Sequence, residues 1–148
     1  MGRQMKSEIQ AKAVLPLFII KMGGKSFRGR TRLQKLIFLT QERVKEFRGF
    51  KFRPAQQGPL SYEVYKLMEN LQALGLVRES EEATYSGNTV ICYRLTDQGK
   101  AFLEFASERD LVSRRIYSAA KEVFKQYGNM PYMQLIEEVH SEYPEYVK

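Results

Sequence analysis

The 148-residue sequence has few of the residues that bind metals or form disulfides. It contains one cysteine, Cys92, and one histidine, His140. A lone cysteine cannot form an internal disulfide, and these two residues cannot supply the four protein ligands of a structural zinc site. We therefore expect no metal and no cofactor. A chain of this length is long enough to be stabilised by its own hydrophobic core.

Long hydrophobic runs are also missing. The longest candidate, residues 13–20, contains Pro16 and is far shorter than the roughly 18 residues that span a bilayer. The first residues lack the apolar core of a signal peptide, and Lys6 stands where the myristoylation pattern requires serine or threonine. These features predict a cytoplasmic protein without a membrane partner.

No group of residues typical of catalysis is present. A nucleophilic Cys92 would need a nearby base, and His140 lies far along the chain in another predicted helix. The segment Gly24-Lys25-Ser26 is similar to part of a phosphate-binding loop, but Ile19 stands where that pattern requires glycine. We therefore expect the protein not to be an enzyme.

Basic residues are concentrated in one segment. The formal net charge is +7, and the segment from Lys25 to Arg53 contains ten basic residues and only two acidic ones, Glu42 and Glu46. Such a concentration favours a polyanionic partner. The alternative is a solubilising surface with a few ion pairs to these two glutamates.

The first half of the chain alternates predicted helices with short irregular segments. A helix is expected over residues 7–22, with Ser7 as its N-cap and Pro16 bending or splitting it. Apolar residues at three- and four-residue spacing predict a second helix over residues 31–49. Alternating residues over 50–53 predict a short strand.

A third helix and a hairpin follow. Ser61 is a good N-cap for this helix, and the pattern changes to period two over residues 76–95, interrupted by a turn signal at residues 86–88. Thr96 is expected to cap a short helix that follows Gly99. This order indicates an α+β fold, mostly α, in which a helix-turn-helix carries a two-stranded wing.

Two further amphipathic helices are predicted beyond residue 107. The first ends at residues 128–129, and Pro131 can start the second. Their buried faces are formed by Val112, Ile116, Ala119, Ala120, Val123 and Tyr127, and by Tyr132, Leu135, Ile136, Val139 and Tyr143. We expect this extension to pack on the core and to support a homodimer.

Several segments together resemble one family. Residues 32–39 (RLQKLIFL), 52–61 (FRPAQQGPLS) and 74–77 (LGLV) with 93–99 (YRLTDQG) are similar to the phage-associated-type winged-helix proteins related to the Panacea (SocA-like antitoxin) domain. The tail over residues 135–146 is similar to that family's closing helix. Residues 74–77 and 93–99 also resemble winged helix-turn-helix transcription regulators in general.

The resemblance implies a winged helix-turn-helix domain over residues 7–107 and a C-terminal helical extension over residues 108–148. It also implies either DNA binding or, as in antitoxin relatives, recognition of a protein partner. It supplies no catalytic residues. We therefore expect a non-enzymatic protein that binds double-stranded DNA as a transcription regulator, with an antitoxin-like protein-interaction module as the alternative.

The residues expected to contact nucleic acid come from the basic segment, the third helix and the wing. They are Lys25, Arg28, Arg30, Arg32, Lys35, Arg53, Gln57, Ser61, Tyr62, Tyr65, Lys66, Tyr85 and Asn88. The third helix also carries Glu63 and Glu69, and the first wing strand contains three glutamates. These carboxylates would repel phosphate, which is why the protein-interaction alternative stays open.

Overall fold

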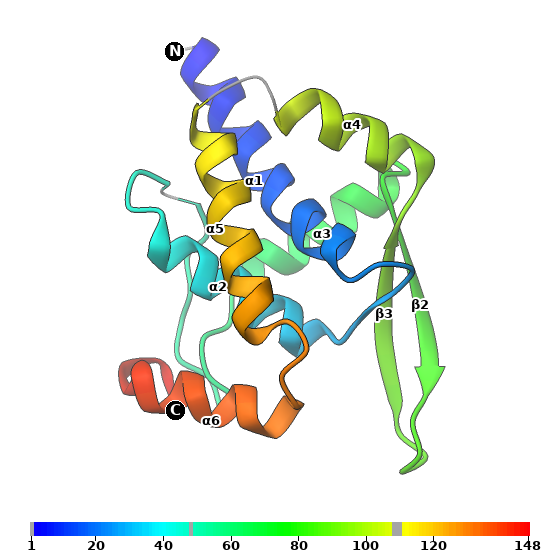
Figure 1. Cartoon of the computed structure of the whole chain (residues 1–148), viewed down its shortest axis with the longest axis vertical. Coiled ribbons are helices and arrows are strands. Elements are labelled where there is room, and N and C mark those ends of the chain that lie inside the picture. Colours follow the sequence, from blue (N-terminus) through cyan, green and yellow to red (C-terminus); the bar gives the residue numbers. More distant parts are fainter. Residues whose placement is uncertain (1, 48, 108–110) are drawn as a thin grey trace.

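The protein has an α+β fold that is mostly helical, with one three-stranded antiparallel sheet (Figure 1). The computed structural model describes residues 2–47, 49–107 and 111–148, and side chains are described from residue 12 onward, except that of residue 107. Arg48 of the basic segment lies outside these ranges, and so do the residues that directly follow the expected domain boundary after residue 107. The α+β, mostly helical class of the fold was predicted correctly from the sequence.

Helix α1 (Gly2–Met22) lies at the centre of the molecule and packs against α2 (Arg30–Arg43), α4 (Asp97–Ser107) and α5 (Leu111–Tyr127). All residues from 13 to 20 are buried, so this part of α1 is apolar on every side. The expected split at Pro16 was wrong, because the helix continues through it. The expected start at Ser7 was also wrong.

Helix α2 is shorter than the sequence predicted. It ends at Arg43, although Val44, Phe47 and Phe50 beyond it are buried in the core. The helical spacing of apolar residues thus continues into an irregular segment, and the predicted end of the helix near residue 49 was therefore wrong. The strand expected over residues 50–53 does not form, since only Arg53 makes a single bridge, to Leu60.

The start of α3 (Tyr62–Ala73) was predicted correctly. Ser61 is its N-cap, and the Ser61 Oγ accepts a hydrogen bond from the Val64 N–H at 3.3 Å. The buried Gln34 side chain of α2 binds both backbone groups of Ser61, with Nε2 donating to the carbonyl at 3.0 Å and Oε1 accepting from the N–H at 2.9 Å. These two bonds fix α3 against α2.

The sheet consists of β1 (Phe27–Arg28), β2 (Val77–Ala83) and β3 (Thr89–Leu95) in the order β1-β3-β2. The β2–β3 hairpin was predicted, and its turn contains Gly87 with φ +85. Strand β1 was missed because a two-residue strand has no detectable period. Figure 1 shows the hairpin projecting from the helical body.

Thr96 joins the two ends of the hairpin to the helices beside it. Its hydroxyl donates to the Gly75 carbonyl at 2.6 Å and accepts from the Gly99 N–H at 2.9 Å. Helix α4 therefore begins at Asp97 and contains Gly99, instead of following it as expected. A Cβ on Gly99 would lie 2.0 Å from the Leu76 carbonyl oxygen, so this close approach requires glycine.

The buried faces of the last two helices were predicted correctly except at Tyr132, which is not part of the hydrophobic core. Helix α5 lies along α1 and α2, and α6 (Tyr132–Glu142) follows across one end of the molecule before the short η1 (Pro144–Tyr146). The Phe38 ring of α2 contacts the rings of Tyr143 and Tyr146, each with centroids 4.9 Å away. Within the described ranges, no helix is long and apolar enough to cross a membrane.

Candidate anion-binding groove

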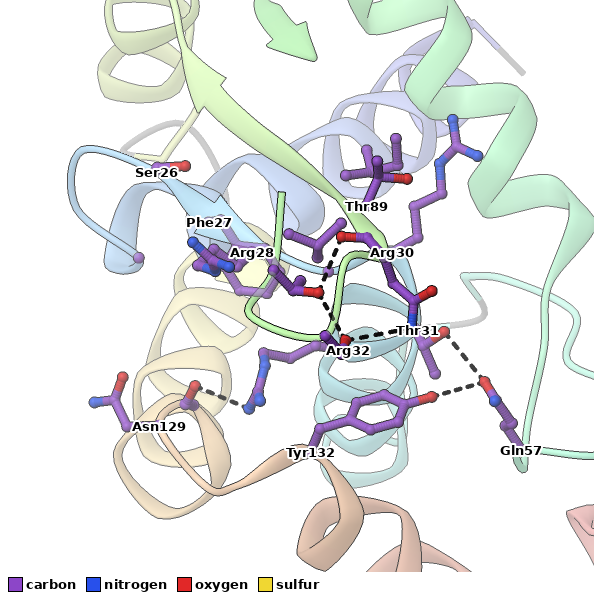
Figure 2. A pocket seen from close by; sticks show the side chains of 18 of the residues that line it. Ser26, Phe27, Arg28, Arg30, Thr31, Arg32, Gln57, Thr89, Asn129 and Tyr132 are labelled. Carbon is purple, nitrogen blue, oxygen red and sulfur yellow. Dashed lines mark hydrogen bonds between the residues drawn. The ribbon is translucent and has the colours of Figure 1, made fainter. Parts of the chain in front are cut away.

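A broad groove lies between the N-terminal end of α2, the hairpin and the turn from α5 to α6 (Figure 2). We call it the α2 groove, and its volume is about 910 Å³. The polar side chains that line it are Ser26, Arg28, Arg30, Thr31, Arg32, Gln57, Thr84, Ser86, Asn88, Thr89, Asn129 and Tyr132. No aspartate or glutamate is among its lining residues.

The first turn of α2 forms one wall of the groove. Gly29 is the N-cap with φ +103, and no side chain caps this helix end. The first intrahelical bond runs from the Leu33 N–H to the Gly29 carbonyl at 3.1 Å, so the N–H groups of residues 30–32 have no partner within the helix. A helix N-terminus of this kind carries partial positive charge and favours an anion.

Arg28 and Arg30 contribute less free positive charge than the sequence indicated. The Arg28 guanidinium binds Glu82 at 2.7 Å, and the Arg30 guanidinium binds Glu79 at 3.0 Å, both glutamates being on β2. Figure 2 shows that the two arginine side chains point in different directions. Both side chains line the groove, but their guanidinium groups are paired with glutamates and do not converge on one point.

Arg30 also belongs to a small polar cluster on the sheet. Its Nε donates to the Tyr93 hydroxyl at 3.3 Å, and the hydrogen bond to Glu79 is the main reason why the pKa of Arg30 is raised. Burial raises the pKa of Tyr93 to about 12. Arg30 therefore stays positively charged and Tyr93 stays protonated at neutral pH.

Arg32 and Lys35 bind backbone carbonyls within the fold. The Arg32 Nη1 donates to the Met130 carbonyl at 2.7 Å and to the Gly128 carbonyl at 3.3 Å, which ties α2 to the end of α5. Burial lowers the pKa of Arg32. Lys35 is 2% exposed, and its Nζ donates to the Pro59 carbonyl at 3.0 Å. Its ammonium group does not reach the surface of the described structure.

Gln57 positions the rim of the groove. Its Oε1 accepts hydrogen bonds from the Tyr132 hydroxyl at 2.8 Å and from the Thr31 hydroxyl at 3.4 Å, and Figure 2 shows this chain of contacts. On the opposite side, the Asn88 Nδ2 donates to the Ser86 Oγ at 3.4 Å within the hairpin turn. Five residues predicted from the sequence thus line the groove, namely Arg28, Arg30, Arg32, Gln57 and Asn88.

The predicted residues on and near α3 lie outside the groove lining. Ser61 is buried as the cap of α3, and Arg53 stacks over the Tyr62 ring with its Cζ 4.9 Å from the centroid. Tyr65 is half-buried in a separate depression beside Arg30 and Tyr93. The remaining predicted residues are exposed outside the lining, and they are Lys25, Lys66 and Tyr85.

Several other hydroxyl and amide side chains of the groove were not among the predicted contact residues. Ser26 and Thr31 come from the segment before and at the start of α2, whereas Thr89 comes from the hairpin and Asn129 from the turn after α5. These four residues have no common spacing or motif, so only the fold brings them together. The predicted start of a helix near Thr31 was the one available signal.

Comparisons with known proteins add no function. A scan of protein-family models finds no match to this chain, and a search of curated proteins finds no significant match. Any functional conclusion therefore depends on the fold and on the groove.

Proposed function

We propose that this chain is a non-enzymatic DNA-binding protein of winged-helix architecture, a transcription regulator that holds the DNA backbone in the α2 groove. The observation that carries this proposal is the lining of the groove. Three arginines, several hydroxyl and amide side chains and an uncapped helix N-terminus line it, without any carboxylate. Phosphate oxygens accept hydrogen bonds from donors of these kinds.

The order of elements supports the winged-helix interpretation. Helix α1, strand β1, helices α2 and α3 and the β2–β3 hairpin follow one another, and β1 pairs with β3 beside the hairpin. In this interpretation α2 and α3 form the helix-turn-helix, joined by the buried Gln34, and the hairpin is the wing. The proposal places the phosphate contact between the wing and α2, and not on the acidic face of α3.

The ion pair of Arg28 does not prevent phosphate binding. Both Arg28 and Glu82 are about half exposed, at 54% and 43% of their side-chain surface. Exposed pairs of this kind contribute about 0–1 kcal/mol, so a phosphate can replace the carboxylate at little cost. The groove offers only a few contacts, so its own contribution to the slope of the logarithm of the binding constant against that of salt concentration should be about −2 to −4.

Fluorescence anisotropy with a labelled DNA duplex at about 50 mM and about 200 mM salt tests the proposal. The decisive variant is Thr89→Glu, which places a carboxylate in the groove lining without removing an internal hydrogen bond of the described structure. Ala101→Glu on the exposed surface of α4 is the matched control, because it changes the net charge equally. We expect Thr89→Glu to weaken binding at least fivefold relative to Ala101→Glu.

Equal affinities of the two variants would place the contact outside the groove. Absence of duplex binding by the unchanged protein at the lower salt concentration would overturn the proposal itself. Arg32→Ala is not a suitable test, since it also removes the bonds between α2 and the end of α5.

A second candidate, an antitoxin-like protein-interaction module, is favoured by a different surface. From Tyr62 to Leu95, which covers α3 and the hairpin, the chain has five acidic and three basic residues. Tyr62 and Leu74 on this part of the chain are 58% and 70% exposed. An acidic surface with exposed apolar side chains is suited to a basic protein partner. Stoichiometric co-purification of one defined protein, lost in Tyr62→Ser with Leu74→Ser, would support this candidate.

A further inference from the structure

We infer that the outward face of α5 is a second contact for the DNA backbone, continuous with the α2 groove. The contact surface is the α5 stripe, defined as Arg114, Ser118, Lys121 and Lys125. This inference rests on the proposed function, because it extends the path of the same partner. None of these four residues belongs to the basic segment between Lys25 and Arg53 that drew attention in the sequence.

The stripe follows from the helical period. Its members are spaced by four, three and four residues, which places them within a narrow band on one side of an α-helix. All four are exposed. The buried residues Ile116, Ala120, Val123 and Tyr127 form the opposite side of the helix. The three cations of the stripe therefore point away from the core, toward the same solvent region.

The cations of the stripe form no ion pair within the part of the chain that the structure describes. Among the described residues, no carboxylate lies within 4.0 Å of the charged nitrogens of Arg114, Lys121 or Lys125. Arg115, one position off the stripe, forms an ion pair with Glu46. The one acidic residue of α5, Glu122, also lies off the centre of the stripe and forms no ion pair in the described structure. The stripe cations therefore remain unpaired in the described structure, whereas Arg28 and Arg30 each form an ion pair with a glutamate.

The stripe ends at the same end of α5 that contributes residues to the groove. Phe124, Gly128 and Asn129 line the groove, and Lys125 lies directly beside the first of them in the chain. Figure 1 shows the end of α5 close to the turn that leads into α6. From Arg114 to Lys125 the helix rises by about 16 Å, at about 1.5 Å per residue. A small anion cannot cover this distance together with the groove, whereas a nucleic-acid backbone can.

The geometry favours a duplex as the ligand. Along each strand of B-DNA one phosphate occurs for about every 3.4 Å of helix axis, so a rise of about 16 Å passes several phosphates. Three lysine and arginine side chains at this spacing are able to contact separate phosphates. Stacking of single-stranded bases would require exposed aromatic rings on the stripe. None of the four stripe residues is aromatic, and the adjacent Tyr117, which is 40% exposed, packs its ring against Phe18 with ring centroids 4.5 Å apart.

The test compares two triple variants of the full chain. The stripe variant is Arg114→Gln with Lys121→Gln and Lys125→Gln. The control is Arg78→Gln with Lys100→Gln and Lys148→Gln, which removes three exposed charges from other surfaces. Both are measured with the labelled duplex, beside Thr89→Glu, and circular dichroism confirms that each variant is folded.

We expect the stripe variant to bind the duplex at least tenfold more weakly than the control at about 0.1 M salt. Its salt slope should be shallower by about 2 to 3, roughly one for each lost phosphate contact. Equal affinities and slopes of the two triple variants would overturn the inference. If Thr89→Glu still weakens binding in that case, the proposed function stands without the stripe.

Two other outcomes also decide the question. If the unchanged protein binds no duplex, both the proposed function and the stripe inference fail. Vesicles that contain phosphatidylserine provide the last arm, since a lipid headgroup also carries phosphate. Stripe-dependent binding to these vesicles, without duplex binding, would assign the face to a membrane surface and overturn the inference for nucleic acid.

Discussion

The buried ammonium group of Lys35 makes the stability of this protein depend on pH in an unusual direction. Lys35 is 2% exposed, and the Pro59 carbonyl is its one hydrogen-bond partner in the described structure. Burial lowers the pKa of Lys35 from its ordinary 10.5 to about 8. The folded state therefore releases this proton at a lower pH than the unfolded state does.

The sign of the effect follows from proton linkage. Below a pH of about 8, Lys35 is protonated in both states, and the folded state bears the full cost of the buried charge. Between about pH 8 and pH 10.5 the unfolded state binds more protons, so the free energy of unfolding rises with pH. With these pKa values the rise between about pH 7 and about pH 10 is about 2–3 kcal/mol.

The variant Lys35→Met removes the titrating group and keeps a flexible side chain of similar length. We expect its free energy of unfolding to lack this rise, so the difference between unchanged protein and variant should shift by about 2–3 kcal/mol over that range. Urea unfolding followed by circular dichroism at several pH values measures the difference. Lys100→Met, at an exposed position of α4, is the control.

Other titrating groups do not obscure this comparison. Burial raises the pKa of Cys92, so this thiol lowers stability as pH rises, but it does so equally in the unchanged protein and in the variant. In the folded state the pKa of Tyr93 is about 12, which lies above the pH range of this comparison. Parallel curves for the unchanged protein and Lys35→Met from about pH 7 to about pH 10 would refute the reasoning.

Substitutions at three further positions test contacts that hold the fold together. For each one, urea unfolding measures the change in the free energy of unfolding. Gly99→Ala should cost about 3 kcal/mol, because the new Cβ would lie 2.0 Å from the Leu76 carbonyl oxygen; an unchanged midpoint would contradict the close approach. Gln34→Ala should cost about 2–4 kcal/mol, since both backbone groups of Ser61 lose a buried partner. Arg32→Ala should cost about 1–3 kcal/mol and Arg32→Lys less, and equal effects would show that the two carbonyl bonds contribute little.

Local signals predicted those elements whose ends are set by their own residues. The Ser61 cap and the turn around Gly87 have their physical causes within a few residues, and both were predicted correctly. Strand β1 and the irregular segment after Arg43 depend on tertiary contacts instead. Phe50 is buried against Phe47 with ring centroids 6.3 Å apart. Its burial produces the alternating pattern of a strand, although no partner strand is present at residues 50–52.

The groove was harder to predict than the fold, because its charge depends on partners distant in the sequence. Arg28 and Glu82 are 54 positions apart, and Arg30 and Glu79 are 49 positions apart. A count of basic residues along the chain treats these arginines as free, whereas the folded sheet brings each one to a glutamate. Lys35 shows the same limit, since a lysine within an apolar helix face can be buried or can extend to solvent.

A dense run of basic residues is therefore a weaker predictor of a basic surface than their period on a helix. The run from Lys25 to Arg53 passes through a turn, a strand and a helix, so its side chains leave the chain in many directions and several reach carboxylates or carbonyls. In α5, by contrast, the spacing that places Ile116 and Val123 in the core also fixes where the opposite residues point. Arg114 and Lys121 must then face solvent together, whatever the remaining fold is. The same periodicity that predicted the buried face of this helix was sufficient to predict its stripe.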